Sequence, residues 1–229
     1  MADQRIIVAL DVSTTSELKD LVAKIPNKHC RVKIGKELFT SVGPLAVDIC
    51  HAAGLDVFLD LKFHDIPNTC AKAVLAAARL GVWMTNVHCA GGADMMRAAR
   101  EILDGQAHRP LLIGVTVLTS MSQQDLLETG VERDLEVQVD HLARLAQQSG
   151  LDGVVCSAQE TQRLRQSLGD RFCLVTPGIR PSWSAQDDQT RIVTPSEAIK
   201  NGSDYLVIGR PITASADPEQ SIAKIIAEL

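Results

Sequence analysis

Short apolar runs rich in β-forming residues recur along the chain, and most are followed by a stretch with helical periodicity. Most runs are continuously apolar rather than alternating, which is typical of parallel strands covered by helices. The runs are RIIVAL (5–10), RVKIG (31–35), DVFLDL (56–61), WMTNVH (83–88), LLIGVTVL (111–118), GVVCSA (153–158), FCLVTP (172–177) and YLVIG (205–209). The pattern therefore predicts eight strands.

The segments between these runs carry apolar residues at helical spacing. Three stripes are clear: Leu18, Leu21, Val22 and Ile25; Leu135, Val139, Leu142 and Ala146; and Ile222, Ile225, Ile226 and Leu229. Five helical segments end in a glycine just before a strand, as expected of helix C-terminal caps, at Gly54, Gly81, Gly150, Gly169 and Gly202. Eight strands alternating with helices predict a single (β/α)8 TIM barrel domain over residues 1–229.

A doubly wound open sheet alternates strands and helices in the same way and is the alternative fold. Its dinucleotide-binding forms usually carry GxGxxG after the first strand, whereas this chain has LDVSTTSEL (10–18) there. That difference favours the barrel. The longest irregular connection follows the seventh run, and its length predicts a mobile lid near residues 180–192.

The composition narrows the function classes. Hydrophobic residues make up 45% of the 229 residues and charged residues 22%, which is ordinary for a globular protein with a sizeable core. The net charge of -5 argues against a general nucleic-acid binder, and no apolar run approaches the roughly 18 residues of a membrane helix. No secretory signal precedes the first strand, and the six cysteines form no CxxC pair. We expect a cytoplasmic protein with no nucleic-acid or membrane partner.

Polar and charged residues fall repeatedly at the ends of the predicted strands, where this barrel collects catalytic groups. They are Asp11, Lys33, Asp60, Lys62, Asn86, His88, Thr119, Arg180, Gly209 and Arg210. Several have a structural explanation of their own. Asp11 could cap the next helix, Lys33 could extend to solvent, and His88, like Asn86, could be a hydrogen-bonded core residue. Their convergence at one rim favours a functional site.

The stretch DLKFHDIPNT (60–69) is the most informative part of the chain. Asp60 and Lys62 are two residues apart, so in an extended strand both side chains point to the same face. That face is either the barrel lumen or the helix layer, and neither tolerates an unpaired charge, so we expect a close ion pair. Asp65 follows in the loop, and Pro67 suits the first turn of a helix. A solvated salt bridge at a strand end is the structural alternative.

This stretch resembles the signature of the orotidine 5'-monophosphate decarboxylase family, in its bacterial branch. The likeness extends over essentially the whole chain, through ALDV (9–12), VKIG (32–35), NVHCAGG (86–92), VTVLTS (115–120), TPGIRP (176–181) and VIGRPIT (207–213). The resemblance implies a barrel that works as a homodimer, with each active site completed by the partner chain. It also implies the last step of UMP synthesis, the direct decarboxylation of orotidine 5'-monophosphate to UMP without a metal or an organic cofactor.

The family's functional residues carry over because each matching motif is present. The resemblance implies that Asp60 and Lys62 lie at the reacting carbon, with Asp65 supplied by the other subunit. Asp11 and Lys33 would hold the ribose hydroxyls, helped by Thr69 of the other subunit, and Thr119 would contact the pyrimidine. The phosphate would be held by Arg180, Gln189, Gly209 and Arg210, and Gln189 would also come within reach of the base.

The reaction explains why such residues are needed. Loss of CO₂ from C6 of a pyrimidine leaves a carbanion with no neighbouring carbonyl placed to absorb the charge. A lysine ammonium can stabilise that charge and then protonate the carbon, so Lys62 is the candidate acid. Asp60 and Asp65 would favour its charged form and hold it in place, as members of an alternating array with Lys33.

Two other functions remain open from the residues alone. Metal-dependent sugar-phosphate decarboxylases and aldolases share the barrel and a DxKxxD strand, and they would need Mg²⁺. The IPNT that follows Asp65 and the PGIRP segment favour the pyrimidine enzyme. A non-catalytic nucleotide-binding barrel could keep Gly209 and Arg210 without Lys62 or Asp60, whereas this chain has all four residues.

Overall fold

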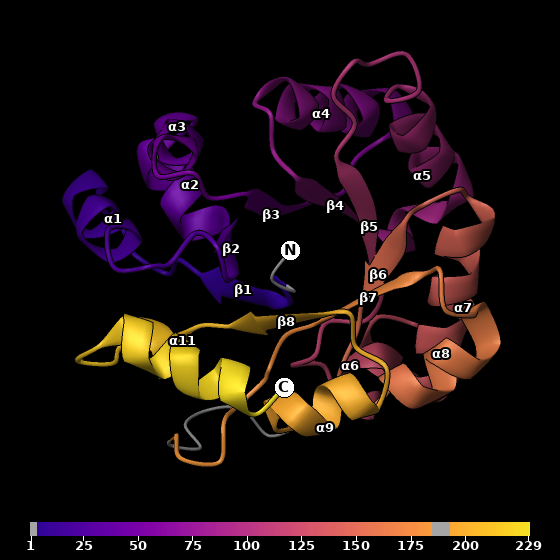
Figure 1. The fold of residues 1–229 in the computed structure, drawn as a ribbon. Coiled ribbons are helices and arrows are strands. Elements are labelled where there is room, and N and C mark those ends of the chain that lie inside the picture. The colour runs from indigo at the N-terminus through magenta and orange to yellow at the C-terminus, as the bar shows by residue number, and fades with distance from the viewer. Residues whose placement is uncertain (1–3, 185–192) are drawn as a thin grey trace.

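The computed structural model describes residues 4–184 and 193–229. Its eight strands pair in parallel in chain order, and the last strand pairs with the first, which closes the barrel seen in Figure 1. The strands are β1 Ile6–Ala9, β2 Cys30–Ile34, β3 Val57–Phe63, β4 Met84–His88, β5 Leu111–Val115, β6 Gly153–Val155, β7 Cys173–Thr176 and β8 Tyr205–Ile208. The predicted (β/α)8 barrel is therefore confirmed, and the open sheet is excluded.

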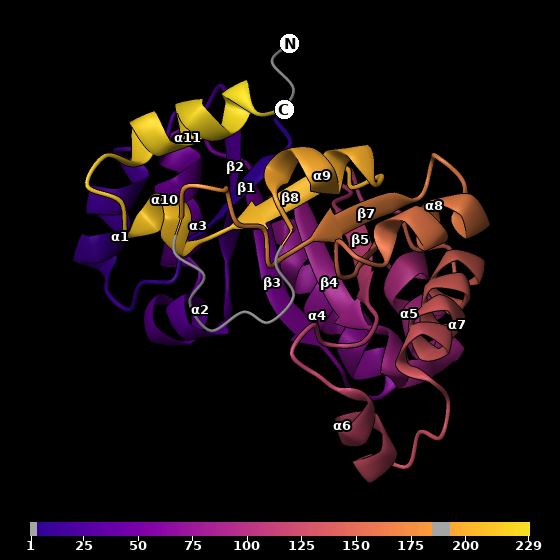
Figure 2. The same ribbon diagram turned by 90° about the horizontal axis from the view of Figure 1, so that it is seen from below.

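Helices surround the strands on the outside (Figure 1). They are α1 Thr15–Val22, α2 Lys36–Val42, α3 Leu45–Ala52, α4 Pro67–Arg79, the 3₁₀ turn η1 Cys89–Gly91, α5 Gly92–Glu101, α6 Gln123–Glu128, α7 Leu135–Gln148, α8 Thr161–Leu168, α9 Pro195–Lys200, α10 Arg210–Thr213 and α11 Pro218–Ala227. Figure 2 shows α6 projecting from one end of the barrel and the C-terminus at the opposite end. Within the described ranges, no helix is long and apolar enough to span a bilayer.

The core has two layers. Between the strands and the helices lie two large apolar clusters, and inside the barrel a smaller third cluster fills the lumen. The lumen cluster consists of Ile7, Ala9, Phe58, Met84, Ile113, Val175 and Val207. Side chains alternate along a strand, so Asp60 and Asn86, two residues beyond Phe58 and Met84, share this inward face. The packed lumen thus ends in polar groups at the barrel mouth.

Most of the predicted helical features are present. All five expected cap glycines have positive φ, between 73° and 108°. The stripe on α11 is only half right, because Ile222 and Ile225 are buried whereas Ile226 and Leu229 are exposed. Asp11 does not cap the first helix, since Thr14 is the N-cap and its side chain accepts a hydrogen bond from the Glu17 amide.

Several strand ends differ from the prediction, among them those of β5 and β1. β5 stops at Val115, three residues before the end of the apolar run, and Leu118 beyond it is 37% exposed. The strand was therefore predicted too long, because the loop that follows β5 is also apolar. β1 stops at Ala9, so Asp11 lies in the loop after the strand rather than at its last position.

Candidate active site

A cavity of about 280 Å³ opens where the strands end and the βα loops begin. It is lined by Ala9, Asp11, Lys33, Phe58, Asp60, Lys62, Val115, Val117, Leu118, Thr119, Val155, Pro177, Gly178, Ile179, Arg180, Val207, Gly209 and Arg210. Eight of the residues predicted for the site are among them: Asp11, Lys33, Asp60, Lys62, Thr119, Arg180, Gly209 and Arg210. The remaining walls are mostly apolar, so the charged groups face a partly dry space in which electrostatic interactions are strong.

Strand β3 carries the central ion pair. Lys62 Nζ lies 2.6 Å from Asp60 Oδ1, so the pair expected from their spacing is present. The Asp60 side chain is 11% exposed and that of Lys62 is 26% exposed. A lysine held this way keeps a fixed ammonium at the cavity wall, where little reorganisation is needed to meet a new negative charge.

Strand β2 adds a second cation. Lys33 Nζ lies 3.3 Å from Asp60 Oδ2 and 4.0 Å from Asp11 Oδ1, and the Lys33 side chain is largely buried. Asp60 therefore sits between two ammonium groups, one on each carboxylate oxygen. The four residues Asp11, Lys33, Asp60 and Lys62 form a row of alternating charge along one wall of the cavity.

The balance of forces on Asp60 keeps it ionised. Burial is the largest single influence and would raise its pKa, but Lys33 and Lys62 act in the opposite direction, as do hydrogen bonds from Lys62 and Asn86. Together these contacts hold the pKa of Asp60 below its ordinary value. The carboxylate is consequently a permanent anion at neutral pH, placed beside the ammonium of Lys62.

Asn86 on β4 takes part in this arrangement more directly than its sequence position indicated. It is fully buried, its Nδ2 donates to Asp60 Oδ1 at 2.7 Å, and its Oδ1 accepts from the backbone N–H of Lys62 at 2.8 Å. The pattern at the strand ends places Asn86 at the rim, and a hydrogen-bonded core residue is the structural alternative. The only signal for this contact was its position in the inward row of β4.

His88, the next residue of that inward row, stacks on His64 with ring centroids 5.5 Å apart. Its Nδ1 is buried and has no hydrogen-bond partner among the described residues. Burial lowers the pKa of His88, and the neighbouring His64, Lys62 and Lys36 lower it further. The ring therefore favours its neutral form beside Lys62 and Lys36. Its Nδ1 lacks the partner that a hydrogen-bonded core histidine would have within the described part of the chain.

The residues predicted to bind phosphate also line the cavity. Arg180 follows β7 and is 5% exposed, while Gly209 and Arg210 join β8 to α10. A Cβ placed on Gly209 would lie 3.4 Å from Asp11 Oδ2, so Gly209 lies beside one end of the charge row. Gln189, predicted for the same role, and most of the predicted lid lie outside the described residues.

Two predicted residues do not line the cavity of this chain. Asp65 and Thr69 are exposed, on the loop after β3 and in the first turn of α4. The Asp65 carboxylate accepts a hydrogen bond from the Ile66 amide at 2.7 Å, and Ile66 itself is 67% exposed. The charge row of one chain therefore ends at Lys62.

Comparisons with known proteins agree with this geometry. Residues 4–225 match the family described as "Orotidine 5'-phosphate decarboxylase / HUMPS family". The chain belongs to this family. It is 56% identical over 225 residues to the orotidine 5'-phosphate decarboxylase of Hahella chejuensis, covering 98% of this chain and 97% of the relative. It is 57% identical over 227 residues to that of Saccharophagus degradans, covering 99% and 95%.

A solved structure supports the same family placement. The crystal structure of orotidine 5'-phosphate decarboxylase from Lactobacillus acidophilus superimposes with a TM-score of 0.87 at 39% identity, covering 99% of both chains. The orotidine 5'-phosphate decarboxylase / HUMPS family was thus correctly anticipated from the motifs. Its description names more than one group of proteins, so the family alone does not specify the activity of this chain.

Proposed function

We propose that this protein is an orotidine 5'-phosphate decarboxylase that converts orotidine 5'-monophosphate into UMP and CO₂ in pyrimidine biosynthesis. The names of its relatives support this function over the sugar-phosphate enzymes. The observation that carries the proposal is the Lys62 ammonium 2.6 Å from Asp60 at the wall of the cavity. All six cysteines are free, which supports action in the cytoplasm.

In the proposed reaction Lys62 acts on the pyrimidine carbon C6. The bond between C6 and the carboxylate breaks, CO₂ leaves, and the electron pair stays on C6. The Lys62 ammonium stabilises this charge as it forms and then gives a proton to C6, after which solvent reprotonates the amine. We propose that no metal is needed, because the fixed ammonium supplies the positive charge that a metal ion would otherwise provide.

Asp60 has two parts in this proposal. It fixes the Lys62 ammonium in place, and it presents a permanent negative charge close to where the substrate carboxylate would lie. Repulsion between the two carboxylates would be relieved as CO₂ departs, which favours the transition state over the bound substrate. Lys33, 3.3 Å from the other Asp60 oxygen, prevents Asp60 from taking up a proton instead.

The rest of the cavity suits the ribose and the phosphate. We assign Asp11 and Lys33 to the ribose hydroxyls and Thr119 to the pyrimidine ring. The guanidinium groups of Arg180 and Arg210 suit a phosphate dianion, with Gly209 allowing its close approach and Gln189 contributing from the lid. Binding energy from this remote phosphate would be available to assemble the reacting end of the site.

We also propose that the protein works as a homodimer in which Asp65 and Thr69 reach the active site of the other subunit. Both residues are exposed in the single chain, and they flank the strongly exposed apolar side chain of Ile66. The Asp65 carboxylate accepts a hydrogen bond from the Ile66 amide and is exposed, so another chain can reach it. Sedimentation at assay concentrations should show two subunits per particle; a monomer with full activity would contradict this arrangement.

The activity is tested by following the absorbance of orotidine 5'-monophosphate after addition of purified protein. Turnover should persist unchanged in excess chelator. Activity that is lost on chelation and restored by Mg²⁺ would indicate the metal-dependent sugar-phosphate chemistry instead. Tight binding of UMP without turnover in a folded sample would indicate a nucleotide-binding barrel and end the proposal.

A further inference from the structure

The backbone of Lys62 is in an unfavourable conformation. It has a φ of 53°, and it is the only non-glycine residue with positive φ among the residues the structure describes. In this region Cβ crowds the following carbonyl, so a side chain is tolerated only where surrounding contacts hold it. The pairing between β3 and β4 also shifts register between Leu59 and Phe63. The strand is therefore distorted at the residue that carries the proposed chemistry.

Asn86 makes the contacts that hold this distortion. Its Oδ1 accepts from the Lys62 N–H at 2.8 Å, and its Nδ2 donates to Asp60 Oδ1 at 2.7 Å. The same Asp60 oxygen accepts from Lys62 Nζ at 2.6 Å. A side-chain amide offers an acceptor to the N–H and a donor to the carboxylate from one planar group. The side chain thus closes a loop of hydrogen bonds through both charged residues.

We infer that Asn86 is a positioning residue for the reaction: its amide holds Lys62 in the left-handed backbone conformation and fixes Asp60 against the Lys62 ammonium. This inference rests on the proposed decarboxylase function. Asn86 does not line the cavity, so it acts through Lys62 and Asp60 and not on the substrate. Without it, the N–H of Lys62 loses its acceptor, the backbone can relax towards extended values, and the direction of the Lys62 side chain changes.

The neighbouring residue Thr85 provides a matched control. It is also fully buried on β4, and its hydroxyl donates to the Leu59 carbonyl of β3 at 3.2 Å. Thr85→Val therefore removes a buried hydrogen bond between the same two strands without touching Asp60 or Lys62. Comparing it with Asn86→Ala separates a general weakening of the strand pair from a loss of positioning.

The first measurement is steady-state kinetics with orotidine 5'-monophosphate. Asn86→Ala should lower kcat by about 100-fold, the scale of a misplacement near 1 Å, with KM changed by less than about 3-fold. Thr85→Val should keep kcat within about 3-fold of the wild type. Asn86→Asp keeps the acceptor for Lys62 but replaces the donor to Asp60 with a second carboxylate, so its kcat should also fall. This second variant decides the matter if Asn86→Ala does not fold.

The second measurement is the pH dependence of kcat/KM, which a purely structural role would not move. The hydrogen bond from Asn86 is one of the influences that lower the pKa of Asp60. Its removal should raise that pKa, so the loss of activity at low pH should begin at a higher pH in Asn86→Ala. Asn86→Asp should shift it in the same direction, and Thr85→Val should not shift it.

Two outcomes would overturn the inference: wild-type kcat and pH profile in both Asn86 variants, or an equal loss of kcat in Thr85→Val. The inference can also be separated from the proposed function. If the wild type does not decarboxylate the substrate, a crystal structure of Asn86→Ala and a ¹³C titration of the Asp60 carboxylate still decide positioning. An unchanged Lys62 φ, an unchanged distance from Nζ to Asp60 and an unshifted titration would refute it.

Discussion

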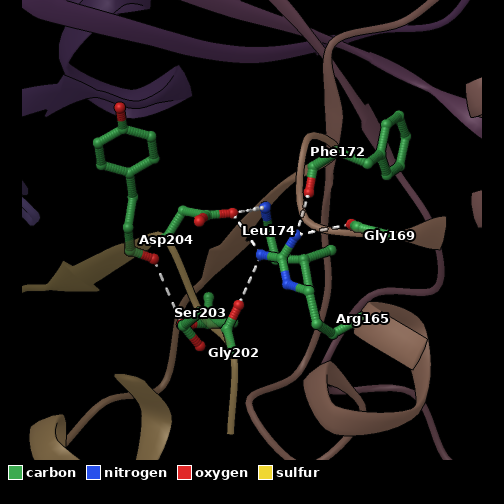
Figure 3. Close-up of polar contacts among 9 residues, drawn as sticks. Arg165, Gly169, Phe172, Leu174, Gly202, Ser203 and Asp204 are labelled. Carbon is green, nitrogen blue, oxygen red and sulfur yellow. Dashed lines mark hydrogen bonds and ion pairs between the residues drawn. The ribbon is translucent and has the colours of Figure 1, made fainter. Parts of the chain in front are cut away.

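Buried or half-buried ion pairs lie at both ends of this barrel, and they differ in how their cations are bound. At the mouth, Asp60 lies between two lysines beside a cavity. At the floor, where the strands begin, Arg165 on α8 binds Asp204 at 2.7 Å. Arg165 also donates to the carbonyl oxygens of Gly169, Phe172 and Gly202 at 2.7–2.9 Å, as Figure 3 shows. The guanidinium is therefore surrounded by acceptors, whereas the lysines at the mouth face open space.

The floor arrangement occurs twice. Asp204 accepts from the Leu174 N–H at 2.7 Å and returns its own N–H to the Leu174 carbonyl. Asp152 does the same with Leu112, and Arg100 on α5 is its cation at 3.1 Å. A hollow of about 840 Å³ lies beside these groups, yet both carboxylates are already bound to backbone and arginine.

This difference shows how a charged group with a structural role can be told from one with a catalytic role. An arginine has its donors in a fixed fork, and at the floor Nη1 and Nη2 of Arg165 make four hydrogen bonds that join α8 to the starts of β7 and β8. A lysine is a compact charge on a flexible stem, and at the mouth its ammonium is held by carboxylates and exposed to the cavity. The volume of a neighbouring cavity does not separate structural charged groups from catalytic ones. The number of hydrogen bonds that a charged group already makes does.

The largest expected effect is at the mouth. Lys62→Ala should lower kcat/KM by at least about 1,000-fold, because it removes both the positive charge and the proposed proton donor. Its free energy of unfolding should change by less than about 1 kcal/mol, since Asp60 keeps Lys33 and Asn86 as partners. Steady-state kinetics and urea denaturation of the same preparation check both parts. Full activity would remove Lys62 from the reaction.

Mixing variants sharpens this result and tests the proposed dimer. Lys62→Ala and Asp65→Ala should each be nearly inactive alone. If Asp65 acts on the other subunit, a mixed dimer contains one site with both native residues, so mixing the two variants should restore activity. No recovery after verified subunit exchange would contradict a shared site.

The next effect is at the floor and has the opposite character. Asp204→Ala should reduce the free energy of unfolding by about 2–3 kcal/mol, because it leaves the Leu174 N–H and the Arg165 charge without their carboxylate. The kcat of the folded enzyme should stay within about 2-fold of the wild type. Calorimetry should show the melting temperature falling by roughly 5–10 °C.

An exposed pair provides the control for that prediction. Asp94 and Arg97 form an ion pair on the surface of α5, with side chains 86% and 51% exposed. Asp94→Ala should change stability by less than about 0.5 kcal/mol, because exposed pairs are weak. An equal effect of the two substitutions would mean that the floor pair has no special structural role.

Much of the fold was predictable because it depends on local patterns. Every apolar run overlaps an observed strand, and the cap glycines mark where helices end. The aspartates at the floor follow two of these glycines in the sequence, but their contacts were not predicted. Gly150 and Gly202 each precede a floor aspartate by two residues, and a Cβ on either would come within 3.4 Å of Arg100 or Arg165. The glycines were read as caps, although they also make room for these arginines.

The site was predictable to the extent that strand ends meet at one rim. The alternation along β3 placed Asp60 and Lys62 together, and the structure brings Lys33 from β2 to the same carboxylate. The contact of Asn86 with the Lys62 N–H was not predictable, because it depends on the positive φ of Lys62, which no residue pattern indicates. Short helices such as α6 were also missed, since Leu126 is its single buried residue and leaves no stripe.

The smallest expected effect concerns pH at the mouth. Burial, His64, Lys62 and Lys36 lower the pKa of His88, so the folded protein resists protonating this ring. As pH falls through about 6.5, the ordinary pKa of histidine, the unfolded chain takes up a proton that the folded chain does not. The free energy of unfolding should therefore decrease towards pH 5, and His88→Gln should reduce that slope. Urea denaturation at several pH values measures it.

The control for this pH dependence is a histidine that lies away from the ion pairs at the mouth and at the floor. His141 is exposed on α7, so His141→Gln removes a histidine without altering the mouth. Its stability relative to the wild type should stay level over the pH range in which His88→Gln gains. If both variants gained stability equally, the pH dependence of the free energy of unfolding would come from the number of histidines and not from the surroundings of His88. The acid sensitivity would then belong to the chain as a whole, and the mouth would differ from the floor only in its lysines.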